Sequence, residues 1–547
     1  MPEPRLTRRI LLGAAAGSAT ALPFLTARAT PVATPSASSV TPRPIPPEAA
    51  ATYVFDVTLD TETSTIAGTA SIGWRNTTGH DQNTLYLRLY PNATYYGDAE
   101  TTLSQVMVDG RASSATSGAS DPTVASISLG RTVSPEDTVR IDLAFTTRVP
   151  LGSAGSFGIF GVDMDRGSWA LADWYPILAG WEPERDAWYL DAPTPFGDPT
   201  FPETATYALS LAAPEGFALI GTGDVISTRA DRIGSLPATV HRIETGPVRE
   251  FAMALLPMTT ATDGALRRYP APNSAATPST APVATPIPTT PDPAVLVSLY
   301  ADEDIPGLAE AILDAAKTAL PHYRALLGPL PEDAIEIASS HLAGANGVSW
   351  PGMVWLDLTI LARDGELGEE ERPGLRFTVV HEIGHQWIGG MLGLNSNDHG
   401  FMLEGLTNAL AIGVIREAWG GDAAIEAMGR FVAGPYSGLV RDGRDELADQ
   451  PLTPDTNTVL RALAVYGKAG LGFEAIRQAL GTDAWRAAMS GFAARFRFGV
   501  FTPDDLRTAL MAAASDPNTI DALWTFWFEE TRTMLPDIDP VVQGAGA

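Results

Sequence analysis

The chain of 547 residues has no cysteine, few histidines and few basic residues. The absence of cysteine excludes disulfides, a thiol nucleophile and any metal site with a cysteine ligand. The 36 lysines and arginines stand against 64 aspartates and glutamates, so the formal net charge is −28. Because phosphate binding requires basic patches, this balance argues against nucleic acid as a partner and against docking on anionic membrane surfaces. High solubility alone would account for the charge, which says nothing about the fold.

Long apolar runs are absent after the amino terminus, so we expect no membrane-spanning segment in the mature chain. The amino terminus itself is typical of an export signal. Arg5, Arg8 and Arg9 precede the apolar run 10–25, and Ala27-Arg28-Ala29 offers a cleavage site. The paired arginines favour the twin-arginine route, by which bacteria export folded proteins, with an ordinary secretory signal as the alternative. We therefore predict an exported protein, extracellular or in the cell envelope of a bacterium.

Composition and periodicity divide the rest of the chain. Alternating apolar and polar residues separated by turn residues predict strands, whereas apolar residues at helical spacing dominate after residue 295. Two Pro- and Thr-rich tracts have no capacity for a packed core. The predicted parts are an export signal (1–29), a linker (30–49), a β domain (50–260), an insert (261–294), a mainly helical catalytic domain (295–480) and a C-terminal helical part (481–547).

Individual elements follow from the same periodicities. In the β domain we expect strands over 53–59, 66–74, 84–90, 138–145, 205–212 and 240–256. In the helical half we expect strands over 334–340 and 352–358, and helices over 305–327, 402–419, 459–480, 485–496, 503–514 and 518–530.

Two of the seven histidines occur as His381-Glu382-Ile383-Gly384-His385, and Glu404 follows the second after eighteen residues. Histidines four apart leave the same face of a helix, so both imidazoles can bind one zinc ion. Glu404 would supply a third, oxygen ligand and leave the fourth position to water, as in catalytic zinc sites. Pro373 suits the start of the helix that carries the pair.

A lone histidine is more often a surface or core residue than a metal ligand. With seven histidines in the chain, however, a chance H-E-x-x-H is expected in on the order of one per cent of such sequences or fewer. The added carboxylate lowers that chance by roughly another order of magnitude. The sequence therefore predicts one zinc ion per chain.

The constellation resembles the aminopeptidase N and leukotriene-hydrolase family of zinc gluzincins. The eighteen-residue spacing to Glu404 is that family's spacing, and Glu404-Gly405-Leu406 matches its segment after the third ligand. Tyr466-Gly467-Lys468-Ala469-Gly470 is similar to its Y-x-K-G-A segment, and residues 173–176 and 201–223 look like segments ahead of its catalytic domain. The resemblance implies a multidomain α+β protein with an all-β, saddle-like domain, a thermolysin-like, mainly helical zinc domain and a helical tail.

Residue roles follow from this resemblance and from zinc chemistry. His381, His385 and Glu404 would hold zinc, and Glu382 would act as the general base toward the attacking water. The resemblance assigns Tyr466 the role of donor to the oxyanion, with a helix-packing tyrosine as the alternative. Asn408, one turn beyond Glu404, is a candidate to orient a histidine ligand, although an ordinary hydrogen bond on the helix surface would also suit it.

The substrate-binding segment departs from the family. Family aminopeptidases carry a glutamate on an edge strand, and it binds the α-ammonium group of the substrate. Here that segment reads Asn346-Gly347-Val348-Ser349-Trp350, which assigns Gly347 and Ser349 to substrate binding and puts serine where glutamate is expected. A serine hydroxyl cannot compensate a buried ammonium charge.

Three functions therefore stay open. The leading one is an exported zinc metallopeptidase that hydrolyses peptide substrates as an aminopeptidase. The second is a zinc endopeptidase on oligopeptides, since the loss of the ammonium anchor would let longer chains pass. The third is a catalytically inactive zinc-binding scaffold, against which the presence of both Glu382 and Tyr466 speaks. The sequence leaves the oligomeric state and the preferred side chain open.

Overall fold

The computed structural model describes residues 41, 43–118, 121–152, 157–196, 200–260, 264–265, 267–270, 296–301, 305, 307–332, 334–362, 367–453 and 455–547. The predicted export signal, most of the predicted linker and residues 261–263, 266 and 271–294 of the predicted insert lie outside these ranges. None of the helices within the described ranges is long and apolar enough to cross a membrane.

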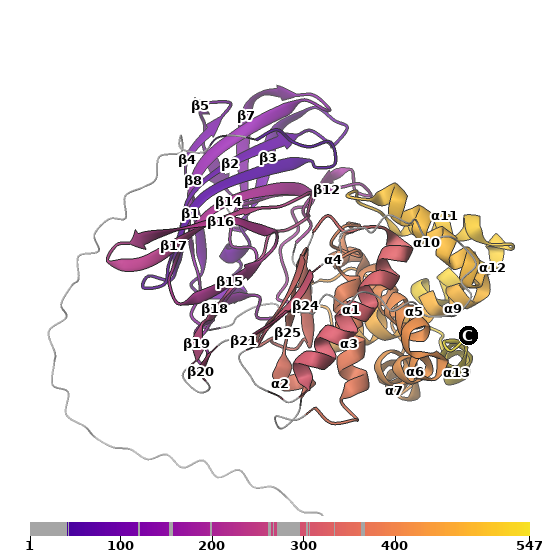
Figure 1. Cartoon of the computed structure of the whole chain (residues 1–547). Coiled ribbons are helices and arrows are strands. Elements are labelled where there is room, and N and C mark those ends of the chain that lie inside the picture. Colours follow the sequence, from indigo (N-terminus) through magenta and orange to yellow (C-terminus); the bar gives the residue numbers. More distant parts are fainter. Residues whose placement is uncertain are drawn as a thin grey trace, which may run out of the picture. The chain divides into compact units, whose positions relative to one another are not determined.

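Strands build the whole first half of the described chain (Figure 1). The largest sheet has the order β16-β17-β14-β1-β2-β8-β4-β5, with bounds Asp224–Ile233, Leu236–Glu244, Ala205–Pro214, Ala51–Asp60, Thr65–Arg75, Thr138–Arg148, Glu100–Val108 and Arg111–Ala112. One four-stranded sheet contains β15 (Phe217–Gly221), β18 (Met253–Pro257), β10 (Ser168–Leu171) and β9 (Phe160–Asp163). Another contains β11 (Ile177–Leu178), β3 (Gln82–Arg88), β7 (Val124–Val133) and β6 (Ala115–Ser117). The short strands β12 (Trp181–Glu182) and β13 (Ala187–Trp188) form a hairpin.

Alternation explains the strand at the centre of the largest sheet. Tyr53, Phe55, Val57 and Leu59 of β1 are buried, and the residues between 54 and 60 that alternate with them are more exposed. Successive side chains of a strand point to opposite faces, so these four enter one apolar core. The predicted run 240–256, by contrast, is two strands, β17 and β18, that belong to different sheets. Gly246 and Pro247 lie in the break between them, where turn residues end the ladder.

A five-stranded sheet accompanies the helices of the second half, with the order β21-β22-β23-β25-β24 (Figure 1). Its strands are Arg267–Pro270, Leu296–Ala301, Ala334–Ser339, Met353–Leu356 and Gly347–Trp350. β22, β23 and β25 run parallel, and β24 pairs antiparallel with β25 as the edge strand. Pairing of β21 with β22 shows that residues 267–270, predicted as part of the insert, belong to this sheet.

Helices account for most of the remaining chain. The longer ones are α1 (Leu308–Leu327), α3 (Arg372–Gly384), α5 (Leu406–Trp419), α9 (Ala469–Leu480), α10 (Thr482–Phe496), α11 (Pro503–Ala513) and α13 (Leu535–Gly544). The shorter ones are α2 (Leu358–Leu361), α4 (Ser396–Gly400), α6 (Gly421–Ala427), α7 (Gly434–Arg441), α8 (Thr458–Ala462) and α12 (Pro517–Trp524). One apolar core runs from Val297 to Ala545, so the predicted C-terminal part packs into the same core as the predicted catalytic domain.

An all-β region followed by a mainly helical one confirms the predicted fold class. Three predicted helices differ in detail, because each contains a π-helical turn. η4 (Phe401–Gly405) precedes α5, η6 (Leu463–Lys468) separates α8 from α9, and η7 (Thr525–Glu529) follows α12. A π-turn adds a residue to the helical repeat and changes the direction of its side chains, which apolar periodicity does not reveal. η4 and η6 carry residues of the predicted site.

Candidate metal centre

Helix α3 positions the histidine pair. It begins with a proline in its first turn, where the missing N–H has no helical partner to lose. It ends at Gly384, and His385 is its C-cap with helical dihedral angles, so the i, i+4 relation of His381 and His385 is kept. Gly384 permits close packing, since a Cβ there would lie 2.8 Å from the Tyr323 hydroxyl of α1 and 2.9 Å from Thr407 of α5. The glycine thus lets α1 and α5 both pack closely against α3.

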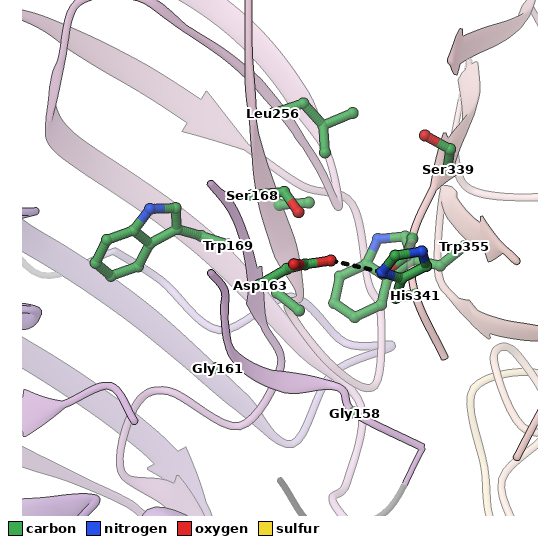
Figure 2. Close-up of a pocket in the computed structure, with 12 residues that line it drawn as sticks. Gly158, Gly161, Asp163, Ser168, Trp169, Leu256, Ser339, His341 and Trp355 are labelled. Carbon is green, nitrogen blue, oxygen red and sulfur yellow. Dashed lines mark hydrogen bonds and ion pairs between the residues drawn. The ribbon is translucent and has the colours of Figure 1, made fainter. Parts of the chain in front are cut away.

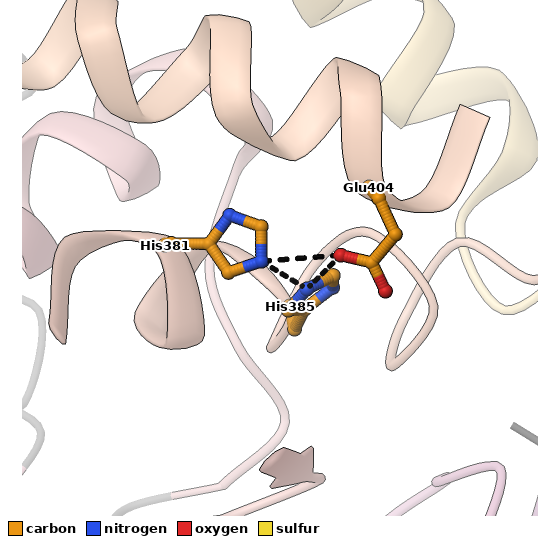
Figure 3. Close-up of side chains that lie close together, drawn as sticks. All are labelled: His381, His385 and Glu404. Carbon is orange, nitrogen blue, oxygen red and sulfur yellow. Dashed lines mark hydrogen bonds and ion pairs between the residues drawn. The ribbon is translucent and has the colours of Figure 1, made fainter. Parts of the chain in front are cut away.

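The three predicted ligands converge (Figure 3). The Nε2 atoms of His381 and His385 are 2.9 Å apart, and they lie 3.2 and 3.3 Å from Glu404 Oε2. The side chains of His381, His385 and Glu404 are 8, 12 and 17% exposed, so their donor atoms face one another in a mostly buried site. Within the described residues, this trio is the group of histidine and acidic side chains close enough to hold a metal ion.

The donor set fits zinc. Ligand atoms about 2.0–2.1 Å from a tetrahedral ion lie about 3.3 Å from one another, close to the three distances observed here. His385 Nδ1 lies 3.2 Å from the carbonyl of Ile388, which can accept its proton and leave the Nε2 lone pair free to bind a metal. Two imidazole nitrogens and one carboxylate oxygen match a catalytic zinc site with an open position.

Electrostatics of the cluster also favour a cation. Burial opposes ionisation of Glu404, but the two histidines outweigh it and hold the pKa of that carboxyl well below its usual range. Burial likewise works against protonated His385, yet Glu404 and Glu382 raise the pKa of this imidazole to about 9. Negative charge on two buried carboxylates therefore stabilises positive charge at this point, which a metal ion would supply.

Glu382 lies on the same helix, facing the edge strand β24. Its side chain is buried, and this burial raises the pKa of its carboxyl group, although the neighbouring histidines and Ser349 oppose the rise. The Ser349 hydroxyl lies 2.7 Å from Glu382 Oε2 and 2.9 Å from its backbone carbonyl. A Cβ on Gly347 would lie 2.6 Å from Glu382 Cγ. The two predicted substrate-binding positions thus share one face of β24 and contact the candidate base.

Tyr466 lies near His381, and Asn408 contacts the backbone of Tyr466. The rings of Tyr466 and His381 have centroids 6.2 Å apart, and Tyr466 is 37% exposed. Desolvation and the charges of Glu404 and Glu382 raise the pKa of Tyr466 above its usual value, so its hydroxyl stays a donor. Asn408 donates 3.0 Å to the backbone carbonyl of Tyr466, and no hydrogen bond to either zinc-site histidine is seen among the described residues. Its predicted role as a histidine partner stays a prediction.

Gln386 is a functional neighbour that the motif alone did not indicate. It is buried directly after His385, and its side chain donates to the carbonyl of Trp350 at 2.9 Å and accepts from Gly352 N at 2.8 Å. These bonds join the helix of the metal ligands to the turn between β24 and β25. The available signal was a polar side chain between the apolar residues Ile383 and Trp387, because a buried amide must find partners.

A separate small cavity lies between β9, β10 and β23 (Figure 2). His341 Nδ1 lies 2.8 Å from Asp163 Oδ2 at its wall, so the pair joins the β region to the sheet of the helical half. Its volume of about 20 Å³ has room for about one water molecule. The cavity is too small for a peptide and belongs to packing rather than to the metal centre.

Comparison with known proteins agrees with this geometry. Residues 335–527 match the model of the peptidase family M1 domain. The chain is also similar to aminopeptidase N of Lactobacillus helveticus, with 25% identity over 232 residues. That match covers 40% of this chain and spans about a quarter, 26%, of the curated relative.

Solved structures share the fold. The M1 zinc metallopeptidase from Deinococcus radiodurans superposes with a TM-score of 0.60 at 13% identity, over 90% of this chain and 96% of that one. A mutant of the Deinococcus radiodurans enzyme bound to a Tyr-Ser-Ala substrate gives 0.59 at 14% identity, over 89 and 96%. A two-domain M1 zinc metallopeptidase mutant bound to L-arginine gives 0.61 at 13%, over 90 and 96%.

The chain shares the fold of the M1 zinc metallopeptidases and carries a His–His–Glu cluster that fits zinc. The match of residues 335–527 to the peptidase family M1 domain confirms the predicted resemblance to the aminopeptidase N family.

Proposed function

We propose that this chain is an exported zinc metallopeptidase that hydrolyses peptide bonds in an aminopeptidase-like manner. The observation that carries the proposal is the buried carboxylate of Glu382 on the same helix as two of three convergent metal ligands. A purely structural metal site needs no such group, so the arrangement speaks against an inactive scaffold.

The chain's own residues divide the work. Zinc held by His381, His385 and Glu404 would act as a Lewis acid toward the scissile carbonyl and the attacking water. Glu382 would accept the proton of that water and return it to the departing amine. Burial raises the pKa of this carboxyl group, which makes it a better proton acceptor. The neutral hydroxyl of Tyr466 would donate to the oxyanion. The unpaired side of β24 offers backbone groups to an extended peptide.

Aminopeptidase action is supported by the relatives, several of which were solved with free amino acids or a short peptide. Endopeptidase action on oligopeptides remains the second candidate, and Ser349 favours it. This side chain is uncharged, and its hydroxyl already donates a hydrogen bond to Glu382. Position 349 therefore supplies no carboxylate for an α-ammonium group.

One experiment separates these functions. Wild type and Glu382→Gln are assayed on a peptide library in free-amino and N-acetylated form, with zinc measured in each protein. We expect about one zinc per chain in both, loss of wild-type activity with a chelator, and a fall in turnover of on the order of 10²–10⁴-fold in the variant, as for removal of a general base.

Each outcome assigns the function. Cleavage restricted to free-amino peptides supports the aminopeptidase, and equal cleavage of blocked peptides makes the protein an endopeptidase. If the zinc-loaded wild type cleaves none of the peptides, the protein is an inactive zinc-binding scaffold. Unchanged turnover in Glu382→Gln would remove Glu382 as the base.

Export rests on the paired arginines and the cleavage site in residues 1–29. In a bacterium with the twin-arginine route, we expect the secreted protein to begin at Thr30 and the double lysine variant of Arg8 and Arg9 to stay inside as uncleaved precursor. Sequencing of the mature amino terminus and cell fractionation test this. Export of the lysine variant would point to the ordinary secretory route.

A further inference from the structure

Lys468 lies two residues beyond Tyr466, at the end of η6, and its side chain is completely buried. Its ammonium group contacts both carboxylate oxygens of Asp445, at 2.9 and 3.0 Å. It also donates to the carbonyl of Glu446 at 2.8 Å and to that of Glu530. A lysine has three protons to donate, so this buried charge is fully hydrogen-bonded as well as paired.

Asp445 connects three segments at this point. It accepts a hydrogen bond of 2.6 Å from the hydroxyl of Tyr436 in α7, and one of 2.9 Å from the backbone N–H of Thr533. Together with Lys468, it joins α7, the segment before α13 and the π-turn η6. None of these contacts involves a metal ligand or Tyr466 itself.

The Tyr466 turn also packs closely against the helical segment of Glu404. A Cβ on Gly405 would lie 2.4 Å from the Cβ of Ala469, the residue after Lys468, so the two backbones are in near contact. Asn408 adds the 3.0 Å hydrogen bond to the carbonyl of Tyr466. The turn is thus held both by contacts with the Glu404 segment and by the ion pair of Lys468.

A buried ion pair is weak evidence for stability, because apolar residues of similar volume often serve a fold as well or better. Its distinctive property is that it accepts only one arrangement of its partners. We propose that Lys468, paired with Asp445, is a positioning residue that fixes the Tyr466 turn opposite Glu404. The inference rests on the proposed function, in which the Tyr466 hydroxyl faces the reacting carbonyl.

The test is a double-mutant cycle between Lys468→Met and Tyr466→Phe on a cleaved peptide, with zinc content measured throughout. Tyr466→Phe should lower kcat by on the order of 10²–10³-fold, as for loss of an oxyanion donor. Lys468→Met should lower kcat by on the order of 10- to 100-fold, with KM and zinc content near wild type, because it displaces that donor. In the Tyr466→Phe background it should have no further effect.

Two further variants serve as controls. If Lys468→Met alone unfolds the protein, the double variant Lys468→Met with Asp445→Asn is used instead, because it removes both buried charges. Arg477→Met breaks another buried pair, Arg477 with Glu474 at 2.7 Å, in the neighbouring helix α9. We expect this control to lower stability without a selective loss of kcat. A loss of kcat of equal size in both backgrounds, or none at all, would overturn the proposal.

Hydrogen–deuterium exchange provides a readout without substrate. Lys468→Met should raise exchange in residues 463–468, whereas Arg477→Met should not. Unchanged exchange in this turn would overturn the positioning role whether or not any peptide is cleaved. Failure of the proposed function would appear separately, as an inactive wild type in which the exchange difference persists.

Discussion

At the scale of single residues, glycines allow close packing around the metal site. Gly384 lets Tyr323 and Thr407 contact the helix that carries the histidines, and Gly405 lets the Glu404 segment contact Ala469. Gly347 leaves space beside Glu382 that any larger residue would occupy. The close approach also brings polar side chains within hydrogen-bond distance, and Ser349 donates to the candidate base Glu382.

Gly347→Ala tests the residue scale. Its Cβ would approach Glu382 to 2.6 Å, so either the carboxylate or strand β24 must move. We expect turnover to fall by on the order of 10²-fold, the typical effect of about 1 Å of misplacement, with zinc content unchanged. Gly491→Ala in α10, where a Cβ meets nothing within 4 Å, is the matched control and should keep full activity. Full activity of Gly347→Ala would show that the strand yields without consequence.

At the scale of elements, an ion-paired histidine joins the β region to the segment that leads to Glu404. His399 of α4 lies 2.7 Å from Glu184, in the turn of the β12–β13 hairpin, and 2.7 Å from Asp449. Both ring nitrogens face carboxylate oxygens, which accept hydrogen bonds, so these contacts stabilise the protonated form of the ring. Arg185 beside it binds Asp398, which adds a second ion pair between the same elements.

The stability contribution of His399 should depend on pH. Burial lowers its pKa, but Asp449 and Glu184 outweigh burial and raise the pKa above the ordinary value of about 6.5. A raised folded-state pKa contributes stability that is fully present below about pH 6.5 and is lost as pH rises through the folded value. The difference in melting temperature between wild type and His399→Gln should therefore be largest near pH 6 and shrink toward alkaline pH. A difference that grows with pH would contradict the charged pair.

At the scale of the whole molecule, the metal centre lies at the meeting point of several elements of one core. Its ligands come from α3 and η4, its candidate base faces β24, and Tyr466 comes from η6. The same apolar core continues to Ala545, so the last helices support the site although they hold none of its ligands. We therefore expect metal binding to be coupled to folding of the helical half.

Removal of zinc should lower the stability of the molecule as a whole. An ion that binds only the folded state stabilises it by about 4 kcal/mol when its free concentration is about a thousand times Kd. We expect a chelator to lower the melting temperature by several degrees and added zinc to restore it, as measured by calorimetry. His381→Ala with His385→Ala, which lacks two ligands, is the control and should not respond to chelator or zinc. An equal response of this control would place the effect outside the cluster.

The sequence by itself determined the parts that depend on local geometry. His381 and His385 share a helix face because four residues make about one turn, and β1 buries alternate residues because a strand has a period of two. The absence of cysteine limited the metal ligands to histidines and carboxylates. Zinc chemistry added Glu404 as a third ligand, 19 residues after His385, and the family resemblance added Tyr466, 81 residues after it. Apolar periodicity does not relate residues over such distances.

Only the tertiary structure decided what these residues contact. It placed Glu404 Oε2 within 3.3 Å of both histidines, directed Ser349 to Glu382, and paired Lys468 with Asp445. The π-turns that carry Glu404 and Tyr466 were not predicted either. Apolar residues recur at helical spacing before and after a π-turn, so the pattern does not reveal one inserted residue. Such contacts depend on how closely the helices approach one another and on which buried polar groups are left to pair. Both are determined by tertiary packing, which a local sequence pattern does not predict.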